Sequence, residues 1–136
     1  MEITATALSL NVAAPRASAD FLSAHLGFTE QMSADGFVSL GHPTAGVNVV
    51  YLRTGLESFK PEHMRGHHAD GLLLAFVVPD VDAEHARLVA EGVPVLTPPE
   101  TEPWGERYLQ VMDPNGVVVQ LVTWVEGPPA EAVVSP

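Results

Sequence analysis

The chain of 136 residues contains no cysteine, few basic residues and no long apolar run. Without cysteine it can form no disulfide framework, no thiolate nucleophile and no zinc site with Cys ligands. No apolar run reaches the roughly 18 residues of a membrane-spanning helix, and the N-terminal residues lack the basic start and cleavage site of a signal peptide. We therefore expect a cytoplasmic protein without a membrane partner.

The scarcity of Lys and Arg also narrows the choice of partner. Six basic residues stand against 17 Asp and Glu, which gives a formal net charge of -11. Such a charge repels the phosphates of nucleic acids and of anionic lipids. Nucleic acid is therefore not an expected partner, and a cationic or neutral small molecule is favoured.

The pattern of apolar residues and turn signals occurs twice along the chain. The first half reads as a strand (4–12), a helix (16–26) and three short strands (28–32, 36–40 and 47–52). The second half reads as a strand (72–78), a helix that ends near Glu91, a strand (93–96) and a hairpin (108–112 and 117–124). Gly27 and Gly92 fit the left-handed caps of the two helices. The chain therefore reads as a tandem repeat of a βαβββ unit.

Alternating strands and helices more commonly form a parallel sheet, but three consecutive strands joined by short turns favour mostly antiparallel pairing. The sequence therefore predicts an α+β fold with mixed sheets in a single domain, residues 1–136. We place the first module at about 4–54, a connection at about 55–70, the second module at about 71–125 and a tail at 126–136.

Two features of the stretch from Glu100 to Trp124 are candidates for function. We interpret this stretch as a loop, a strand, a turn at residues 113–116 and a second strand. Gln120 is a polar residue among the valines and leucine of the second strand. Trp104 lies between a proline and a glycine on the loop, among glutamates. A polar side chain inside a sheet and an aromatic one on an acidic loop are where we expect the site.

The two modules, the run LGF at residues 26–28, the run AFVVPDVDAEHARLVAEGV and the DPNG hairpin together resemble the vicinal oxygen chelate superfamily. That superfamily includes glyoxalase I, extradiol dioxygenases, fosfomycin resistance enzymes and bleomycin resistance proteins. The resemblance covers roughly residues 4–125. It implies curved sheets around a cavity and modules that face each other, often across a homodimer.

Metal-using members of this superfamily bind a divalent ion through His and Glu residues on the strands. The matching positions in this chain are Ala7, Leu73, Gln120 and a position near Val49. One amide among apolar residues cannot hold a transition-metal ion, so we expect no metal and no other cofactor.

Three histidines in the connection are further candidates for metal ligands. His63 and His67 have the i, i+4 spacing of two ligands on one helical face, and His68 follows directly. Pro61 and Gly66 oppose a stable helix there. We therefore interpret these residues as ordinary histidines of a solvated connection.

Within the superfamily, the chain is most similar to the bleomycin resistance type. Proteins of that type are small, acidic, metal-free homodimers that hold a flat part of a cationic drug between aromatic side chains. The resemblance places Trp104 and Phe37 at the stacking positions, where each contact contributes ~0.5 to 1.5 kcal/mol beyond burial. The expected ligand-binding residues are Phe37, Trp104, Gln120, Tyr51, Glu102, Glu106 and His42.

The sequence thus predicts a protein that sequesters a planar, cationic or neutral natural product or antibiotic. Two other functions stay open. One is a metal-independent enzyme, lyase-like or isomerase-like, that uses Tyr51, His42, Glu102 or Glu106 as base or nucleophile. The other is a metal-dependent lyase or dioxygenase with a rebuilt set of ligands. Trp104 as a core residue and Phe37 as a residue facing a helix also remain open readings.

Overall fold

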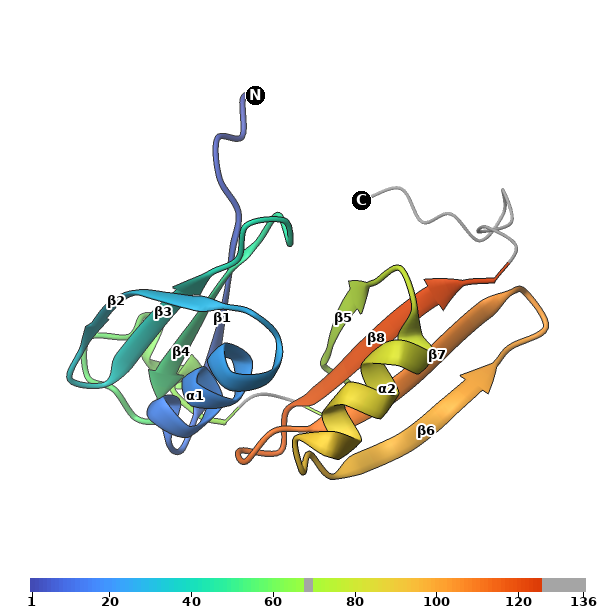
Figure 1. Cartoon of the computed structure of the whole chain (residues 1–136). Coiled ribbons are helices and arrows are strands. Elements are labelled where there is room, and N and C mark those ends of the chain that lie inside the picture. Colours follow the sequence, from blue (N-terminus) through green and yellow to red (C-terminus); the bar gives the residue numbers. More distant parts are fainter. Residues whose placement is uncertain (68–69, 126–136) are drawn as a thin grey trace. The chain divides into compact units, whose positions relative to one another are not determined.

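The computed structural model describes residues 1–67 and 70–125 of the chain. Within these residues there are two four-stranded sheets, each with one α-helix (Figure 1). The chain divides into two compact units, Met1–Leu72 with Asp113–Asn115, and Leu73–Met112 with Gly116–Pro136. In the described part of the chain, neither helix is long and apolar enough to cross a membrane.

The first unit contains one βαβββ module. Its elements are β1 (Ala7–Val12), α1 (Pro15–His25), β2 (Thr29–Ala34), β3 (Phe37–Gly41), β4 (Asn48–Arg53) and a short 3-10 helix, η1 (Glu62–Met64). The strand order is β1-β4-β3-β2, with β1 parallel to β4 and the other neighbours antiparallel.

The second unit repeats this arrangement. Its elements are β5 (Leu73–Val77), α2 (Val81–Ala90), β6 (Val95–Thr101), β7 (Glu106–Met112) and β8 (Val118–Trp124). The strand order is β5-β8-β7-β6, again with one parallel pair, β5 with β8. The predicted α+β fold of two βαβββ modules with mixed sheets is therefore confirmed.

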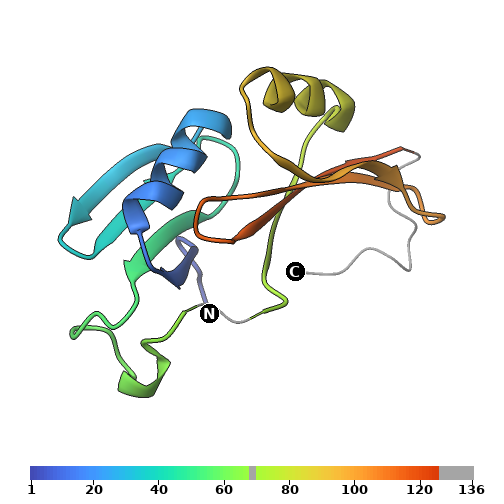
Figure 2. The same cartoon turned by 90° about the horizontal axis from the view of Figure 1, so that it is seen from below.

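Each helix packs on one face of its own sheet (Figure 2). In the first unit, fully buried Leu22 of α1 faces an apolar strand surface that includes Leu40 and Tyr51. In the second unit, Val81 and Leu88 of α2 are buried with strand residues such as Leu109. Because side chains alternate along a strand, the residues between these core positions point to the opposite face.

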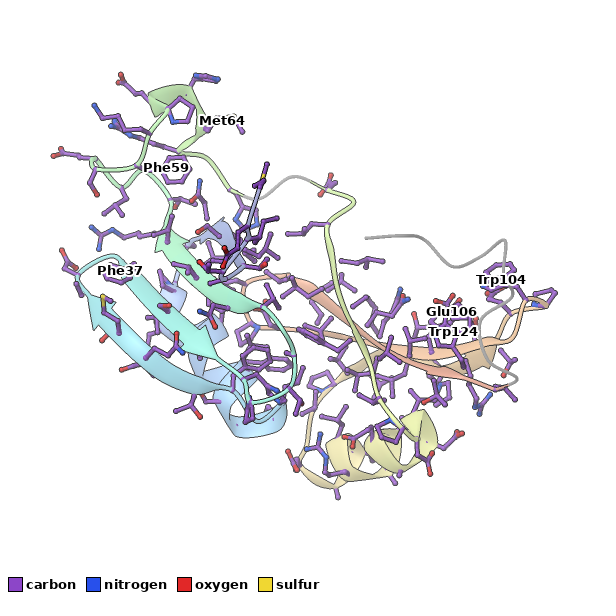
Figure 3. The ribbon with its side chains drawn as sticks, turned by 90° about the horizontal axis from the view of Figure 1, so that it is seen from above. Phe37, Phe59, Met64, Trp104, Glu106 and Trp124 are labelled. Atoms are coloured by element: carbon purple, nitrogen blue, oxygen red, sulfur yellow. The ribbon has the colours of Figure 1, made fainter. Side chains whose placement is uncertain are left out.

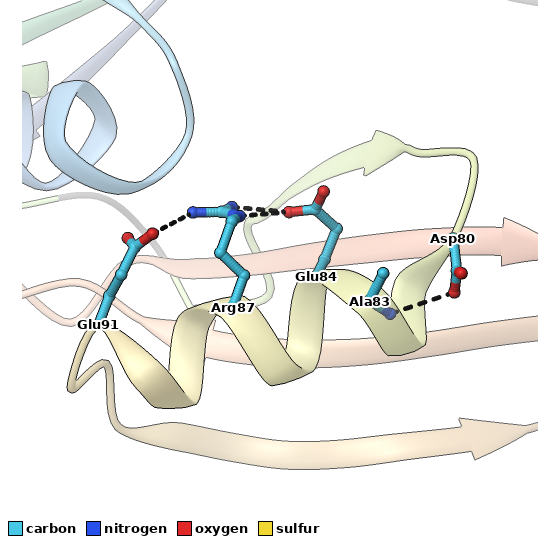
Figure 4. A network of polar contacts seen from close by, with 5 residues as sticks. All are labelled: Asp80, Ala83, Glu84, Arg87 and Glu91. Carbon is cyan, nitrogen blue, oxygen red and sulfur yellow. Dashed lines mark hydrogen bonds and ion pairs between the residues drawn. The ribbon is translucent and has the colours of Figure 1, made fainter.

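Helix α2 carries its own N-terminal cap. The Asp80 carboxylate accepts a hydrogen bond from the Ala83 backbone N–H (3.1 Å) (Figure 4). On the same helix Arg87 bridges Glu84 (2.7 Å) and Glu91 (2.8 Å) (Figure 4). These contacts satisfy or stabilise both ends of a helix of only ten residues.

Helix α1 has no side-chain cap of its own, because its N-cap residue is Ala14. The Asn115 amide takes this role: its Oδ1 accepts from the Ala14 N–H (3.1 Å), and its Nδ2 donates to the Ala14 carbonyl and to Ser18 Oγ (both 2.7 Å). Buried Ser18 also donates to the buried Asp113 carboxylate. The DPNG segment is therefore more than a turn, since it completes the N-terminus of a helix about 100 residues earlier in the chain.

The prediction for the stretch before the DPNG turn was wrong in one respect. Glu100 and Thr101 were expected in a loop, but β6 continues to Thr101 and β7 already begins at Glu106. Pro98 and Pro99 interrupt the apolar pattern and concealed the strand from a reading of the sequence. They are tolerated because β6 is the edge strand of its sheet.

Candidate functional site

The candidate site lies on the open face of the second sheet, by which we mean the face that α2 does not cover. Leu109, Val111, Val119 and Leu121 are buried on the α2 side. Alternation therefore places their strand neighbours on the open face, and the register pairs them across β7 and β8. The open-face residues of these two strands are Glu106, Tyr108, Gln110 and Met112 on β7 and Val118, Gln120, Val122 and Trp124 on β8.

Carboxylates gather at the end of this face nearest the β6–β7 turn. Tyr108 Oη donates to Glu102 Oε1 (2.9 Å), and Glu100 pairs with Tyr108 across β6 and β7. This hydrogen bond, together with partial desolvation and the charges of Glu102, Glu100 and Glu106, raises the pKa of Tyr108 to about 12. We call these four residues the acidic end of the open face.

Arg107 lies within the same stretch but does not neutralise the acidic end. It points to the α2 side, where its guanidinium donates to both carboxylate oxygens of Asp82 (2.8 Å each) and to Thr101 Oγ1 (2.9 Å). The ion pair holds the pKa of Asp82 below its ordinary value, chiefly through these hydrogen bonds. The negative charge of the acidic end is therefore left for another cation.

Trp104 and Trp124 lie at the same end of the sheet as Glu106 (Figure 3). Trp124 pairs with Glu106 across β7 and β8, which places it on the open face. Trp104 occupies the tight β6–β7 turn, in which the Gly105 N–H donates to the Glu102 carbonyl (3.0 Å). Its side chain is 47% exposed, so it is not a core residue.

A row of hydrogen-bonded side chains crosses the middle of the open face. Thr97 Oγ1 donates to Gln110 Oε1 (2.8 Å), and Gln110 Nε2 donates to Gln120 Oε1 (2.8 Å). The three residues come from β6, β7 and β8, and each is half-buried. Gln120 therefore faces away from α2, and its amide oxygen accepts from the neighbouring strand β7; its contact with a ligand stays a prediction.

The other predicted site residues lie in the first unit. Phe37 is half-buried on the face of its sheet opposite α1, because its neighbour Val38 is buried on the α1 side beside Tyr51. His42 packs on the Phe28 ring, with centroids 4.9 Å apart, and its Nδ1 accepts from the Thr44 N–H (3.1 Å). A stacking role for Phe37 and a ligand contact for His42 stay predictions.

Tyr51 is not available to a ligand on an exposed surface. Its side chain is fully buried on the α1 side of the first sheet. Burial, followed by the charge of Asp113, raises the pKa of Tyr51 well above its ordinary value. Among the described residues its hydroxyl has no hydrogen-bond partner. We therefore leave Tyr51 out of the proposed site and treat it as a core residue.

The predicted connection is more ordered than its sequence suggests. Arg65 donates to the carbonyls of Phe59 (3.0 Å) and Glu57, and Asn11 Nδ2 of β1 donates to the Met64 carbonyl (2.7 Å). A cavity of about 540 Å³ lies beside β1, with Phe59, Met64, His63 and His67 among its lining residues. Figure 3 labels Phe59 and Met64. The third histidine, His68, lies outside the described residues.

The residues at the superfamily's metal positions do not fit a transition-metal ion. Ala7 and Leu73 offer no donor atom, and Val49 is buried on the α1 side of its strand. The register places Asn48 rather than Val49 beside Ala7. Two amides and two apolar side chains do not provide the His and carboxylate donors that such an ion prefers. Across residues 1–67 and 70–125, no group of three or more His, Asp or Glu side chains could hold a metal ion.

Three residues of the open face were not predicted from the sequence as site residues: Gln110, Thr97 and Tyr108. The signal for two of them was present, because a hairpin closed by residues 113–117 pairs Met112 with Val118 and therefore Gln110 with Gln120. Tyr108 follows from the same register. Thr97 could not be found in this way, since the register between β6 and β7 shifts at irregularities near it.

Comparison with solved structures shows how widely this fold is shared. The chain is similar to a glyoxalase/bleomycin resistance protein/dioxygenase from Nocardioides, with 25% identity, a TM-score of 0.78 and coverage of 96% of this chain and 89% of that one. It is also similar to TioX from Micromonospora sp. ML1, with 25% identity, a TM-score of 0.68 and coverage of 90% and 99%. Lactoylglutathione lyase from Agrobacterium tumefaciens shares the fold at 17% identity, with a TM-score of 0.70 and coverage of 90% and 94%.

No curated protein gives a significant match to the chain. The profile of one family does match, over residues 4–121, which is most of the chain and includes both βαβββ modules. The chain therefore belongs to the Glyoxalase/Bleomycin resistance protein/Dioxygenase superfamily.

Proposed function

We propose that this protein binds a planar, cationic or neutral natural product without changing it, and so protects against that compound by sequestration. Membership of the superfamily supports small-molecule binding or metal-dependent catalysis in general. The donor set at the superfamily's metal positions favours the first of these for this chain. The proposed ligand lies on the open face of the second sheet, against Trp104.

The observation that carries the proposal is the combination of aromatic rings with uncompensated carboxylates at the acidic end. Trp104 offers an exposed ring on a tight turn, and Trp124 offers a second ring beside Glu106. A planar ligand gains from stacking on such rings, and a cationic group gains further from the ring faces and from Glu102 and Glu106. The net charge of -11 would also speed the approach of a cation.

A metal-independent enzyme is the alternative, and it would need a base or nucleophile near the ligand. Tyr51 is buried, and the Tyr108 hydroxyl with its raised pKa is a poor base at neutral pH. Glu102 and Glu106 remain as candidates on the open face. We favour sequestration because Glu102 is already engaged as the acceptor of the Tyr108 hydrogen bond.

We further propose that the protein is a cytoplasmic homodimer. Leu73, Val77 and Met112 are large apolar residues that are 46%, 69% and 41% exposed on the second unit. Exposed apolar residues on a sheet, together with the free edges of β1 and β5, are features that oligomers commonly cover. Met112 lies on the open face, so a dimer that covers these residues would border the proposed ligand site, but the assembly has its own test below.

Sequestration and catalysis differ in what happens to the bound compound. The protein is incubated with a panel of planar intercalating antibiotics and with glycopeptide antibiotics as a non-planar comparison, then separated from free compound by gel filtration. Sequestration predicts that a planar compound elutes with the protein and is recovered with its mass unchanged. Recovery of a chemically altered compound would support the enzyme instead.

A further inference from the structure

The hydrogen bonds in the row formed by Thr97, Gln110 and Gln120 all run in one direction, and this direction affects which ligand groups can bind at the end of the row. Each residue in the row donates to the next one: the Thr97 hydroxyl to Gln110 Oε1, and Gln110 Nε2 to Gln120 Oε1. Both acceptor oxygens inside the row are therefore occupied. Within residues 1–67 and 70–125, the Gln120 Nε2 group makes no hydrogen bond, so the row ends in an amide donor.

The surroundings of Gln120 do not supply an acceptor for this donor. Apart from Gln110, whose amide nitrogen donates to it, its open-face neighbours across and along the strands are Ala75, Val118 and Val122, all apolar. Tyr108, which is nearest among the polar residues beyond them on β7, already donates to Glu102. A half-buried amide N–H group that lacks a protein partner gains free energy when a ligand oxygen accepts from it.

We propose, on the basis of the function proposed above, that Gln120 selects ligands carrying a carbonyl-type acceptor oxygen, as in a quinone, ketone or lactam. Gln110 and Thr97 are positioning residues in this scheme. Gln110 supports the orientation of the Gln120 amide by donating to its oxygen, and Thr97 supports that of Gln110 in the same way. The row thus sets specificity, while the aromatic rings and the acidic end supply affinity that does not depend on a carbonyl.

The role of Thr97 follows from the symmetry of the amide group. An amide has nearly the same shape when its oxygen and nitrogen exchange places, so only hydrogen bonds decide its orientation. The Thr97 hydroxyl can donate or accept, and in this structure it donates to Gln110 Oε1. Without the hydroxyl that oxygen loses its donor, so Gln110 turns its oxygen toward Gln120 and accepts from Gln120 Nε2. The donor proposed to meet the ligand would then be used inside the protein.

A matched pair of planar probes tests this scheme: aminomethyl-fluorenone, which has one carbonyl, and aminomethyl-fluorene, which has a methylene group instead. Both carry the same ammonium group. Their affinities for the intact protein are measured by tryptophan fluorescence and by NMR of the glutamine side-chain amides. We expect the ketone to bind about fivefold more tightly, the ratio typical of one hydrogen bond between uncharged groups, and to shift the Gln120 amide resonances.

Three variants separate the row from the rest of the site. Gln120→Leu and Thr97→Val should bring the ratio of the two affinities close to one, whatever change they cause in the affinity for the fluorene itself. Thr97→Ser keeps the hydroxyl and should keep the preference for the ketone. Because the ratio is taken within each variant, a general loss of stability does not alter it.

Other outcomes would overturn the inference in distinguishable ways. Equal binding of both probes to the parent, or a preference that survives in Gln120→Leu, contradicts the row as a selector but leaves the proposed function standing. Tighter binding of the fluorene would mean that the row runs in the opposite direction and presents an oxygen. If neither probe binds the parent, the proposed aromatic site itself fails, and the inference fails with it.

Discussion

At the scale of single residues, the acidic end is defined by the ionisation of Tyr108. Its hydroxyl donates to a carboxylate and lies near two more, and all three oppose the formation of a phenolate. Replacing Glu102 by Gln removes the charged acceptor, so the pKa of Tyr108 should fall from about 12 toward its ordinary value near 10. An ultraviolet titration of tyrosinate measures this, with Tyr108→Phe to assign the transition. An unchanged midpoint would contradict the arrangement.

The raised pKa of Tyr108 also makes the stability of the folded protein decline at alkaline pH. The unfolded chain loses the Tyr108 proton near pH 10 and the folded protein only near pH 12, so the folded state holds more protons in this interval. The stability that Tyr108 contributes is therefore present below pH 10 and declines as the pH rises toward 12. Urea unfolding at several alkaline pH values should show a shallower decline for Tyr108→Phe than for the parent.

Tyr51 gives a contrasting prediction in the core. Its fully buried hydroxyl has no partner among the described residues, so removing the oxygen costs no hydrogen bond. Tyr51→Phe keeps the ring and should leave the free energy of unfolding unchanged or raise it by up to about 1 kcal/mol. Denaturant unfolding measures the difference. A loss of more than about 1 kcal/mol would mean that the hydroxyl makes a contact that stabilises the fold.

At the scale of elements, the N-termini of the two helices are capped in different ways. Helix α2 is capped locally by Asp80, whereas α1 depends on Asn115 from the DPNG segment. Asn115→Ala should lower the free energy of unfolding by about 1 to 2 kcal/mol, because the Ala14 N–H loses its acceptor while the Ala14 carbonyl and the Ser18 oxygen each lose one donor. Ser23→Ala, on the exposed surface of α1, serves as the control and should change stability by less than about 0.5 kcal/mol. Equal effects of the two substitutions would contradict the capping role.

Some of these elements and contacts could be predicted from the sequence, and others could not. Apolar periodicity, helix caps at Gly27 and Gly92 and the DPNG turn located both modules, because each is a local signal. The extent of β6 was missed because a proline pair obscures a strand that happens to lie at an edge. The cap from Asn115 to Ala14 is a tertiary contact, which no local pattern predicts.

The site was predictable to a similar degree. Trp104 and Gln120 stand out in sequence because each contrasts with its neighbours, and the hairpin register would have added Gln110 and Tyr108. The burial of Tyr51 could have been inferred from alternation along β4, since Val49 and Tyr51 lie on the same side of that strand. Whether Phe37 meets the ligand depends on the arrangement of modules, which sequence periodicity does not contain.

At the scale of the whole molecule, the proposed homodimer accounts for the exposed apolar residues of β5 and β7. Sedimentation velocity at micromolar concentration should give the mass of two chains. Leu73→Glu places a charge on exposed β5 and should shift the protein toward monomer if this surface is covered in the dimer. Lys60→Glu, an exposed charge change outside both sheets, is the control. A monomeric mass for the parent would reject the dimer and leave the fold intact.

The charge of the whole chain predicts how salt affects binding. Carboxylates act on an approaching cation over the ~8 to 10 Å Debye length of physiological buffers, and added salt shortens this range. The association rate of a cationic planar compound should therefore fall as ionic strength rises, while the dissociation rate changes little. Stopped-flow fluorescence measures both rates, and an association rate that is insensitive to salt would contradict electrostatic attraction by the acidic end.

Stacking of a planar compound on Trp104 is tested by measuring the affinity of Trp104→Ala for a compound that binds the parent. Trp124 remains in this variant and reports binding by its fluorescence. Trp104→Ala should lose about 1 to 3 kcal/mol of binding free energy, as for removal of an aromatic anchor. Its urea unfolding should be unchanged, and Trp104→Phe should lose much less binding free energy. Undiminished affinity of the folded Trp104→Ala variant would contradict stacking on Trp104.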